Sequence, residues 1–143
     1  MNPESVFENA LAESRNAVKV CVNEAAAIDD VAARVAKSHD RVNESKVALN
    51  QLRQAAAEYP EAAAEDRYKA LTASSEKHLS ACIEDYELSQ AVLVDMKSKA
   101  KQTYELVSNG LKSLDELCLN DQHHTDVDAL LAEITACKAA LPT

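Results

Sequence analysis

The fold is decided by residues 35–60, VAKSHDRVNESKVALNQLRQAAAEYP. Val35, Val42 and Leu49 recur at intervals of seven, and Tyr59-Pro60 closes the pattern. A seven-residue apolar repeat is typical of a long amphipathic helix that packs in a coiled-coil manner. Because the residue before a proline avoids the helical conformation, we expect this helix to end at about residue 58.

The same repeat extends in both directions from this stretch. Toward the N-terminus it passes through Cys21 to Phe7, which predicts one helix over about residues 4–58. After the proline comes a second series of residues spaced at intervals of seven: Leu79, Tyr86, Leu93, Ala100, Val107 and Leu114. It predicts a helix over about residues 61–109, where Asn109-Gly110 is a stop signal. Two alternatives stay open: a break of the first helix near residues 23–30, and continuation of the second helix through Gly110 to residue 118.

A shorter third helix is expected after a polar connector. The connector covers residues 119–125, and Thr125 with Asp128 resembles a helix cap. The helix is predicted over about 126–141, before Pro142. The fold class that follows is all-α: a long antiparallel helical hairpin with a short third helix packed at its open end, in a single domain over residues 1–143. A tight turn at Tyr59-Pro60 would place Cys82 opposite Lys37.

Composition excludes several classes of function. The chain has 143 residues, a net charge of −9 and one glycine. A single glycine cannot build the phosphate-binding loops of nucleotide enzymes, which need two or more. An acidic surface disfavours nucleic acids and anionic membranes. Neither a transmembrane run nor a signal peptide is recognised, so we expect a cytoplasmic protein with no membrane insertion. Nothing in the sequence indicates a cofactor or a small-molecule substrate.

The four cysteines favour a reducing compartment. They are widely spaced and include no Cys-x-x-Cys motif, which is unlike a secreted disulfide framework. The expected helix register places no two of them in the same layer. The sequence therefore predicts four free thiols that act as small apolar side chains.

The middle of the second helix is apolar on more than one side. The expected third helix, at about 16 residues, covers only part of the hairpin. A helix whose apolar stripe is too wide for one neighbour packs against a second one. We therefore expect a homodimer or a helical hetero-assembly with another protein. The candidate partner-binding residues are Ile83, Leu88, Val92, Val94 and the acidic residues Glu84, Asp85 and Glu87.

The clusters of potential metal ligands match no known pattern. His123-His124 lies among acidic residues, with Cys118 and Cys137 on either side, but the spacing fits no standard zinc motif. We interpret it as a polar loop and expect no metal. His39 and His78 should lie near one layer, yet neither has the Glu-x-x-His pattern of di-iron bundles.

Catalysis is not expected either. Cys82 lies one helical turn after His78, which suits contact between the two side chains. A thiol nucleophile also needs donors for an oxyanion, and nothing in the sequence supplies them. A metal or thiol enzyme is therefore the weakest of three hypotheses.

The leading hypothesis is a non-enzymatic helical protein for protein–protein interaction or scaffolding. It would dock partner helices through the apolar surface near residues 83–94. The alternative is a small acidic chaperone or inhibitor that holds an amphipathic client helix in a groove. Oligomeric state distinguishes them, because the first hypothesis predicts a stable dimer and the second a monomer.

Overall fold

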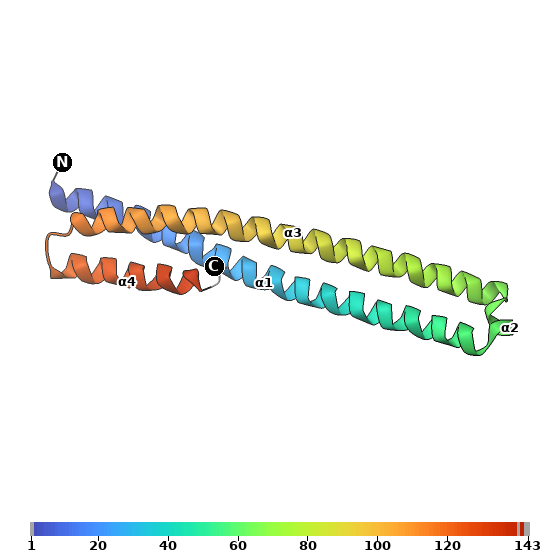
Figure 1. Cartoon of the computed structure of the whole chain (residues 1–143). Helices are drawn as coiled ribbons and strands as arrows, with labels where there is room; N and C mark the ends of the chain where they lie inside the picture. Colours follow the sequence, from blue (N-terminus) through green and yellow to red (C-terminus); the bar gives the residue numbers. More distant parts are fainter. Residues whose placement is uncertain (1, 140, 142–143) are drawn as a thin grey trace. The chain divides into compact units, whose positions relative to one another are not determined.

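The computed structural model describes residues 2–139 and 141. It contains four helices: α1 (Pro3–Glu58), α2 (Pro60–Ala63), α3 (Asp66–Glu116) and α4 (Asp121–Lys138). The described residues contain no strand. The predicted fold class is confirmed, since the long helices α1 and α3 form an antiparallel hairpin and the shorter α4 packs alongside (Figure 1).

Contacts divide the chain into two units. The three-helix unit consists of Met1–Asp30 and Val94–Thr143, and the hairpin unit consists of Val31–Leu93. In the three-helix unit, α4 lies beside the first half of α1 and the last half of α3 (Figure 1). In the hairpin unit, α1 and α3 run side by side and are joined through α2.

Helix α1 is continuous. Asn2 caps its start, because the Asn2 side-chain oxygen accepts a hydrogen bond from the Glu4 backbone N–H at 2.8 Å. The helix runs without interruption through residues 23–30, so the alternative of a break there is wrong. It ends at Glu58, before the Tyr59-Pro60 pair.

The connection between the long helices is longer than expected. Instead of one tight turn at Tyr59-Pro60, α2 adds a helical turn and Ala64-Glu65 separates it from α3. The added residues shift the register of the hairpin. Cys82 therefore lies opposite Ser45, at an Sγ–Oγ distance of 3.8 Å, and not opposite Lys37.

Helix α3 continues through Gly110. Leu111 and Leu114 are buried beyond it, at 0% and 2% exposure. Burying two leucines contributes more than the ~1 kcal/mol that a glycine costs inside a helix. The predicted stop at Asn109-Gly110 is therefore not used, and α3 ends at Glu116.

Helix α4 begins five residues earlier than expected. Its N-cap is Asn120, whose side chain accepts a hydrogen bond from the His123 backbone N–H at 2.9 Å. Thr125, the expected cap, lies inside the helix and donates to the Asp121 carbonyl. Most of the predicted connector 119–125 is thus helical. The helix ends at Lys138, earlier than the predicted end at residue 141, which is described as a bend; Pro142 lies outside the described residues.

The three-helix unit holds the main apolar core. Its members come from all three helices and are almost fully buried. They are Phe7, Leu11, Val18, Cys21, Leu111, Leu114, Val127, Leu130, Ile134 and Cys137. The seven-residue apolar repeat of the first helix predicted that Phe7 and Cys21 of α1 belong to a buried row.

Candidate interaction surfaces

The hairpin unit has a thin seam. On α1 its buried side chains include Val42 and Leu49, but also the polar Ser38 and Ser45. Among the described residues of α3 from Asp66 to Leu93, none is buried; those facing α1 are only half-buried. This unit therefore removes much less apolar surface from water than the three-helix unit does.

Polar contacts compensate in part for the missing apolar layers. The Ser38 hydroxyl donates to an Asp85 carboxylate oxygen across the seam. The Tyr68 hydroxyl donates to the Leu52 carbonyl near the hairpin turn. A neutral hydrogen bond contributes about 1 kcal/mol net, and one to a charged group somewhat more. Asp85 thus takes part in the hairpin itself as well as in the predicted acidic patch.

Leu88 and Val92 form an exposed apolar ridge on α3. Their exposed fractions are 67% and 44%. Four residues apart on a helix, they lie within about 40° of each other around its axis. Val94 is 66% exposed but points about 160° away from Val92, and Ile83 is half-buried. The predicted surface near residues 83–94 therefore comprises more than one face of the helix, and the ridge is the face that lies wholly in the hairpin unit.

Charges of both signs flank the seam of the hairpin unit. Glu84 and Glu87 are exposed on α3, in the same stretch as the ridge. Three basic residues of α1 line a hollow of about 370 Å³ between α1 and α3, and the hollow also contains one carboxylate, that of Asp85. The hollow is lined by Arg34, Lys37, Ser38, Arg41, Asp85 and Ser89. The unit therefore presents a basic region on one helix and an acidic region on the other.

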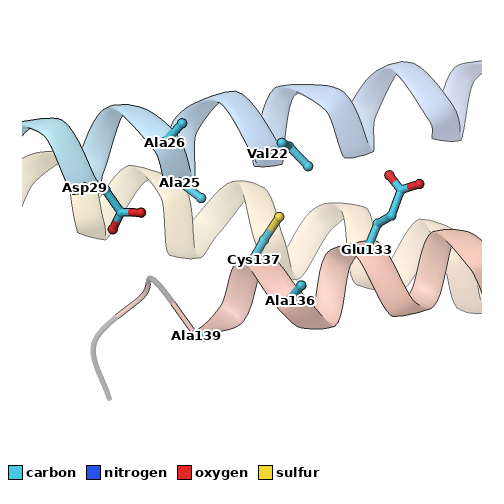
Figure 2. A pocket seen from close by; sticks show the side chains of 8 residues that line it. All are labelled: Val22, Ala25, Ala26, Asp29, Glu133, Ala136, Cys137 and Ala139. Carbon is cyan, nitrogen blue, oxygen red and sulfur yellow. The ribbon is translucent and has the colours of Figure 1, made fainter.

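A second surface, missed by the sequence reasoning, is a shallow apolar groove between α1 and α4 in the three-helix unit. It has a volume of about 670 Å³ and a floor of small side chains. Figure 2 shows Val22 and Ala25 of α1 directed toward the side of α4 that carries Cys137, with Asp29 and Glu133 toward the two ends of the groove; Ala26 and Ala136 also line it. Because alanine leaves space between helices, another chain could approach the two backbones closely here.

His123 is a structural residue of the three-helix unit. Its ring stacks on Phe7 at a centroid distance of 3.7 Å, and the residue as a whole is only 5% exposed. Nδ1 accepts a hydrogen bond from the Leu119 backbone N–H at 3.1 Å, and Nε2 lies 3.5 Å from the Glu4 carboxylate. This pattern requires the tautomer with the proton on Nε2. His123 is therefore engaged in packing, and the polar-loop interpretation was wrong for this residue.

His39 and His78 have separate partners. The His39 ring lies against Tyr86, at a centroid distance of 5.2 Å. His78 Nε2 lies 3.6 Å from Cys82 Sγ, so the contact expected from their spacing is present. Neither histidine belongs to a group of three potential metal ligands among the described residues.

All four cysteines are free thiols, as predicted. The expectation that no two lie near one another was wrong for Cys21 and Cys137. Both belong to the three-helix core, and α4 extends far enough along α1 to bring the two thiols within electrostatic range. Burial raises the pKa of Cys21 from 9.0 to about 11, with smaller contributions from Cys137 and Glu24. Burial, followed by Glu133, raises the pKa of Cys137.

These shifts predict a loss of stability at high pH. A group whose pKa is raised by folding stabilises the fold below its ordinary value, and this contribution disappears as the pH rises through the folded value. For Cys21 that window runs from 9.0 to about 11. We expect the free energy of unfolding, measured with urea, to fall across it, on the order of 2 kcal/mol from this thiol. Cys21→Ala should be less stable at neutral pH but have a flatter profile; equal slopes would contradict the assignment.

No helix among the described residues is both long and apolar enough to cross a membrane. The chain matches no protein-family profile, curated protein or solved structure. Its candidate function therefore follows from its own surfaces, and we consider the ridge on α3 and the groove between α1 and α4.

Proposed function

We propose that this chain is a non-enzymatic helical assembly subunit that docks a partner helix on the Leu88–Val92 ridge of α3. Its simplest partner is a second copy of itself, which gives a homodimer. Another helical protein could bind the ridge in the same way and give a hetero-assembly. The activity is protein binding and needs no cofactor. The four free thiols favour a reducing interior such as the cytoplasm as its location.

The observation that carries this proposal is the unequal burial within the hairpin unit. Between Asp66 and Leu93, the described residues of α3 include no buried side chain, while Leu88 is 67% exposed on the same helix. An isolated pair of helices with so little apolar contact gains little free energy from burial. Covering the ridge with another helix supplies the missing apolar layer and completes a four-helix arrangement.

Charge favours a second copy as the occupant of the ridge. In a two-fold symmetric dimer, a region on one subunit meets a different region on the other, and the reverse contact occurs as well. The acidic Glu84 and Glu87 of one copy can then meet the basic Arg34, Lys37 and Arg41 of the other. Such complementarity fixes the orientation of docking more than it adds affinity.

The test is the oligomeric state of the purified chain. Light scattering after size-exclusion chromatography should give twice the chain mass. Replacing both ridge residues, Leu88→Glu with Val92→Glu, should weaken dimerisation by about 2 kcal/mol or more, roughly 30-fold in the dissociation constant. Val47→Glu is the matched control, because Val47 is 57% exposed on α1 in the same unit and lies on its outer side.

Two results would contradict the dimer. One is a wild-type chain that stays monomeric at every concentration tested. The other is a dimer that the ridge double variant leaves intact while Val47→Glu disrupts it.

A second candidate function has an observation of its own in favour. The groove between α1 and α4 has an apolar floor and carboxylates of Asp29 and Glu133 beside it. These features suit an amphipathic client helix with basic residues flanking its apolar stripe, which is the role of a small chaperone or inhibitor. A monomer that binds such a helix, with binding weakened by Ala25→Glu in the groove floor, would favour this function over the assembly subunit.

A further inference from the structure

Three different metal-ligating side chains meet where α3 turns into α4. A carboxylate oxygen of Asp115, Sγ of Cys118 and a ring nitrogen of His124 all lie within 4.8 Å of one another. Asp115 belongs to the last turn of α3, Cys118 to the connection, and His124 to the first turn of α4. Among the described residues this is the one group of three such ligands. From the sequence, His123-His124 was grouped with Cys118 and Cys137, and of these residues Cys118 and His124 belong to it.

The backbone that carries these ligands is held in place. The Cys118 N–H donates to the Asp115 carbonyl at 3.2 Å, and the His124 N–H donates to the Asn120 carbonyl at 3.3 Å. The neighbouring His123 is anchored between Phe7 and the Leu119 N–H. A site on such a turn needs only side-chain rotation to close.

Two of the three ligand side chains are exposed, while the half-buried Cys118 thiol donates to the Leu114 carbonyl at 3.8 Å and would exchange this contact for the ion. His124 Nδ1 lies 3.5 Å from the Asp115 carboxylate, and the two side chains are 54% and 53% exposed. Bond lengths of about 2.0–2.3 Å to zinc in a tetrahedral site imply donor separations of roughly 3.3–3.8 Å. The three donor atoms, which lie within 4.8 Å of one another, would therefore approach by at most about 1.5 Å around an ion.

The composition of the cluster selects the ion. Thiolate and imidazole are preferred by borderline metals such as zinc, whereas magnesium and calcium require mostly oxygen ligands. One thiolate and one carboxylate neutralise a divalent ion, and imidazole adds a neutral ligand. Three protein ligands leave the fourth tetrahedral position for water.

We propose that Asp115, Cys118 and His124 form a binding site for Zn²⁺ at the α3–α4 turn. On binding, the Cys118 thiol releases its proton to solvent and its sulfur bonds to the ion, while a carboxylate oxygen of Asp115 and a ring nitrogen of His124 supply the other two protein ligands. Asp128 follows His124 by one helical turn and adds negative charge near the thiol, which attracts a cation to the site.

The Cys118 thiol must lose its proton when zinc binds, and its raised pKa opposes this step. Burial raises the pKa of Cys118, and the Asp115 and Asp128 carboxylates raise it further. A bound cation offsets the repulsion between the thiolate and the two carboxylates, because it stabilises the thiolate. Zinc affinity should therefore fall as the pH is lowered, since each ion bound must displace the thiol proton.

The test is a titration of the reduced, metal-free full chain with ZnCl₂, in competition with a chromophoric chelator, and with CoCl₂ as a spectroscopic probe. We expect one ion per chain and a thiolate-to-cobalt charge-transfer band. Cys118→Ser and His124→Gln should each weaken zinc binding by more than about 100-fold, and Asp128→Asn by about 10-fold. The matched control replaces a different neighbouring Cys–His pair, His78→Gln with Cys82→Ser. This double variant should leave the zinc affinity unchanged.

Circular dichroism of each variant verifies that the helices are retained. Because His124 is exposed, His124→Gln tests the site without disturbing the core. The proposal is overturned if the wild-type chain competes for no zinc, if cobalt binds without a thiolate band, or if the affinity survives both ligand substitutions. Loss of binding in the His78/Cys82 control alone would place the ion elsewhere and also overturn it.

Discussion

Leu111→Ala is expected to lower the free energy of unfolding by about 3 kcal/mol. Leu111 lies on α3 with 0% exposure, inside the apolar core of the three-helix unit. Removing its side chain beyond Cβ loses apolar burial and leaves a cavity among neighbours from α1 and α4. The chain relaxes only partly around such a cavity, which adds to the cost of the lost burial. Urea denaturation monitored by circular dichroism gives the change directly.

Leu106→Ala is the matched control for this substitution. Leu106 lies on the same helix, five residues earlier, and is 74% exposed. The same truncation there should change the free energy of unfolding by no more than about 0.5 kcal/mol. If the two variants were equally stable, α3 would not pack through Leu111, and its continuation past Gly110 would lose its physical explanation.

The seam of the hairpin was predictable because burial follows the sevens pattern closely. The row that starts at Phe7 and repeats every seven residues includes Cys21, Ile28, Val42 and Leu49, which are buried, whereas its members Ser14, Val35 and Ala56 are half-buried. A sustained apolar period reports which side of a helix faces its neighbour, whatever that neighbour is. The same period shows why the contribution of α3 is small, since only one of its two half-buried rows, Leu79, Tyr86 and Leu93, carries large side chains, and the other consists of Ser75, Cys82 and Ser89.

The helix ends were less predictable because they depend on tertiary contacts. Asn109-Gly110 is a good local stop signal, yet the burial of Leu111 and Leu114 keeps α3 helical. Thr125 and Asn120 are both acceptable caps, and the sequence does not show that His123 packs on Phe7. That contact favours the start at Asn120, because it requires His123 to lie in the first turn of α4.

The candidate metal site was only partly predictable for a similar reason, since the sequence grouped Cys118 with His124 but did not include Asp115. Known zinc motifs combine ligands at standard spacings, and Asp115, Cys118 and His124 match none of them. Their proximity arises from the turn between α3 and α4, whose length was overestimated when residues 119–125 were taken as a connector. Cys118 follows Asp115 by three residues, and His124 follows Cys118 by six. These side chains come together only because α4 begins at Asp121.

Phe7→Ala is expected to have a larger effect, about 4 kcal/mol in the free energy of unfolding. Phe7 is the one phenylalanine in the chain, is 1% exposed and stacks on His123 with an angle of 14° between the rings. Its removal takes away the largest apolar side chain of the core and uncovers an imidazole. The His123 ring then loses the packing that holds Nδ1 against the Leu119 N–H. Urea denaturation measures the total effect, and hydrogen exchange of the Leu119 amide measures the local one.

Phe7→Leu separates apolar volume from aromatic stacking. Leucine keeps most of the burial, so this variant should lose only about 1.5 kcal/mol. The Leu119 amide should nevertheless exchange faster than in the wild-type chain, because the ring that covers His123 is gone. If Phe7→Ala left both the stability and the exchange of this amide unchanged, the start of α1 would not be docked on α4. Faster exchange at Leu119 with little global loss would instead mean that the Phe7–His123 contact orders the α3–α4 turn and adds little to the core.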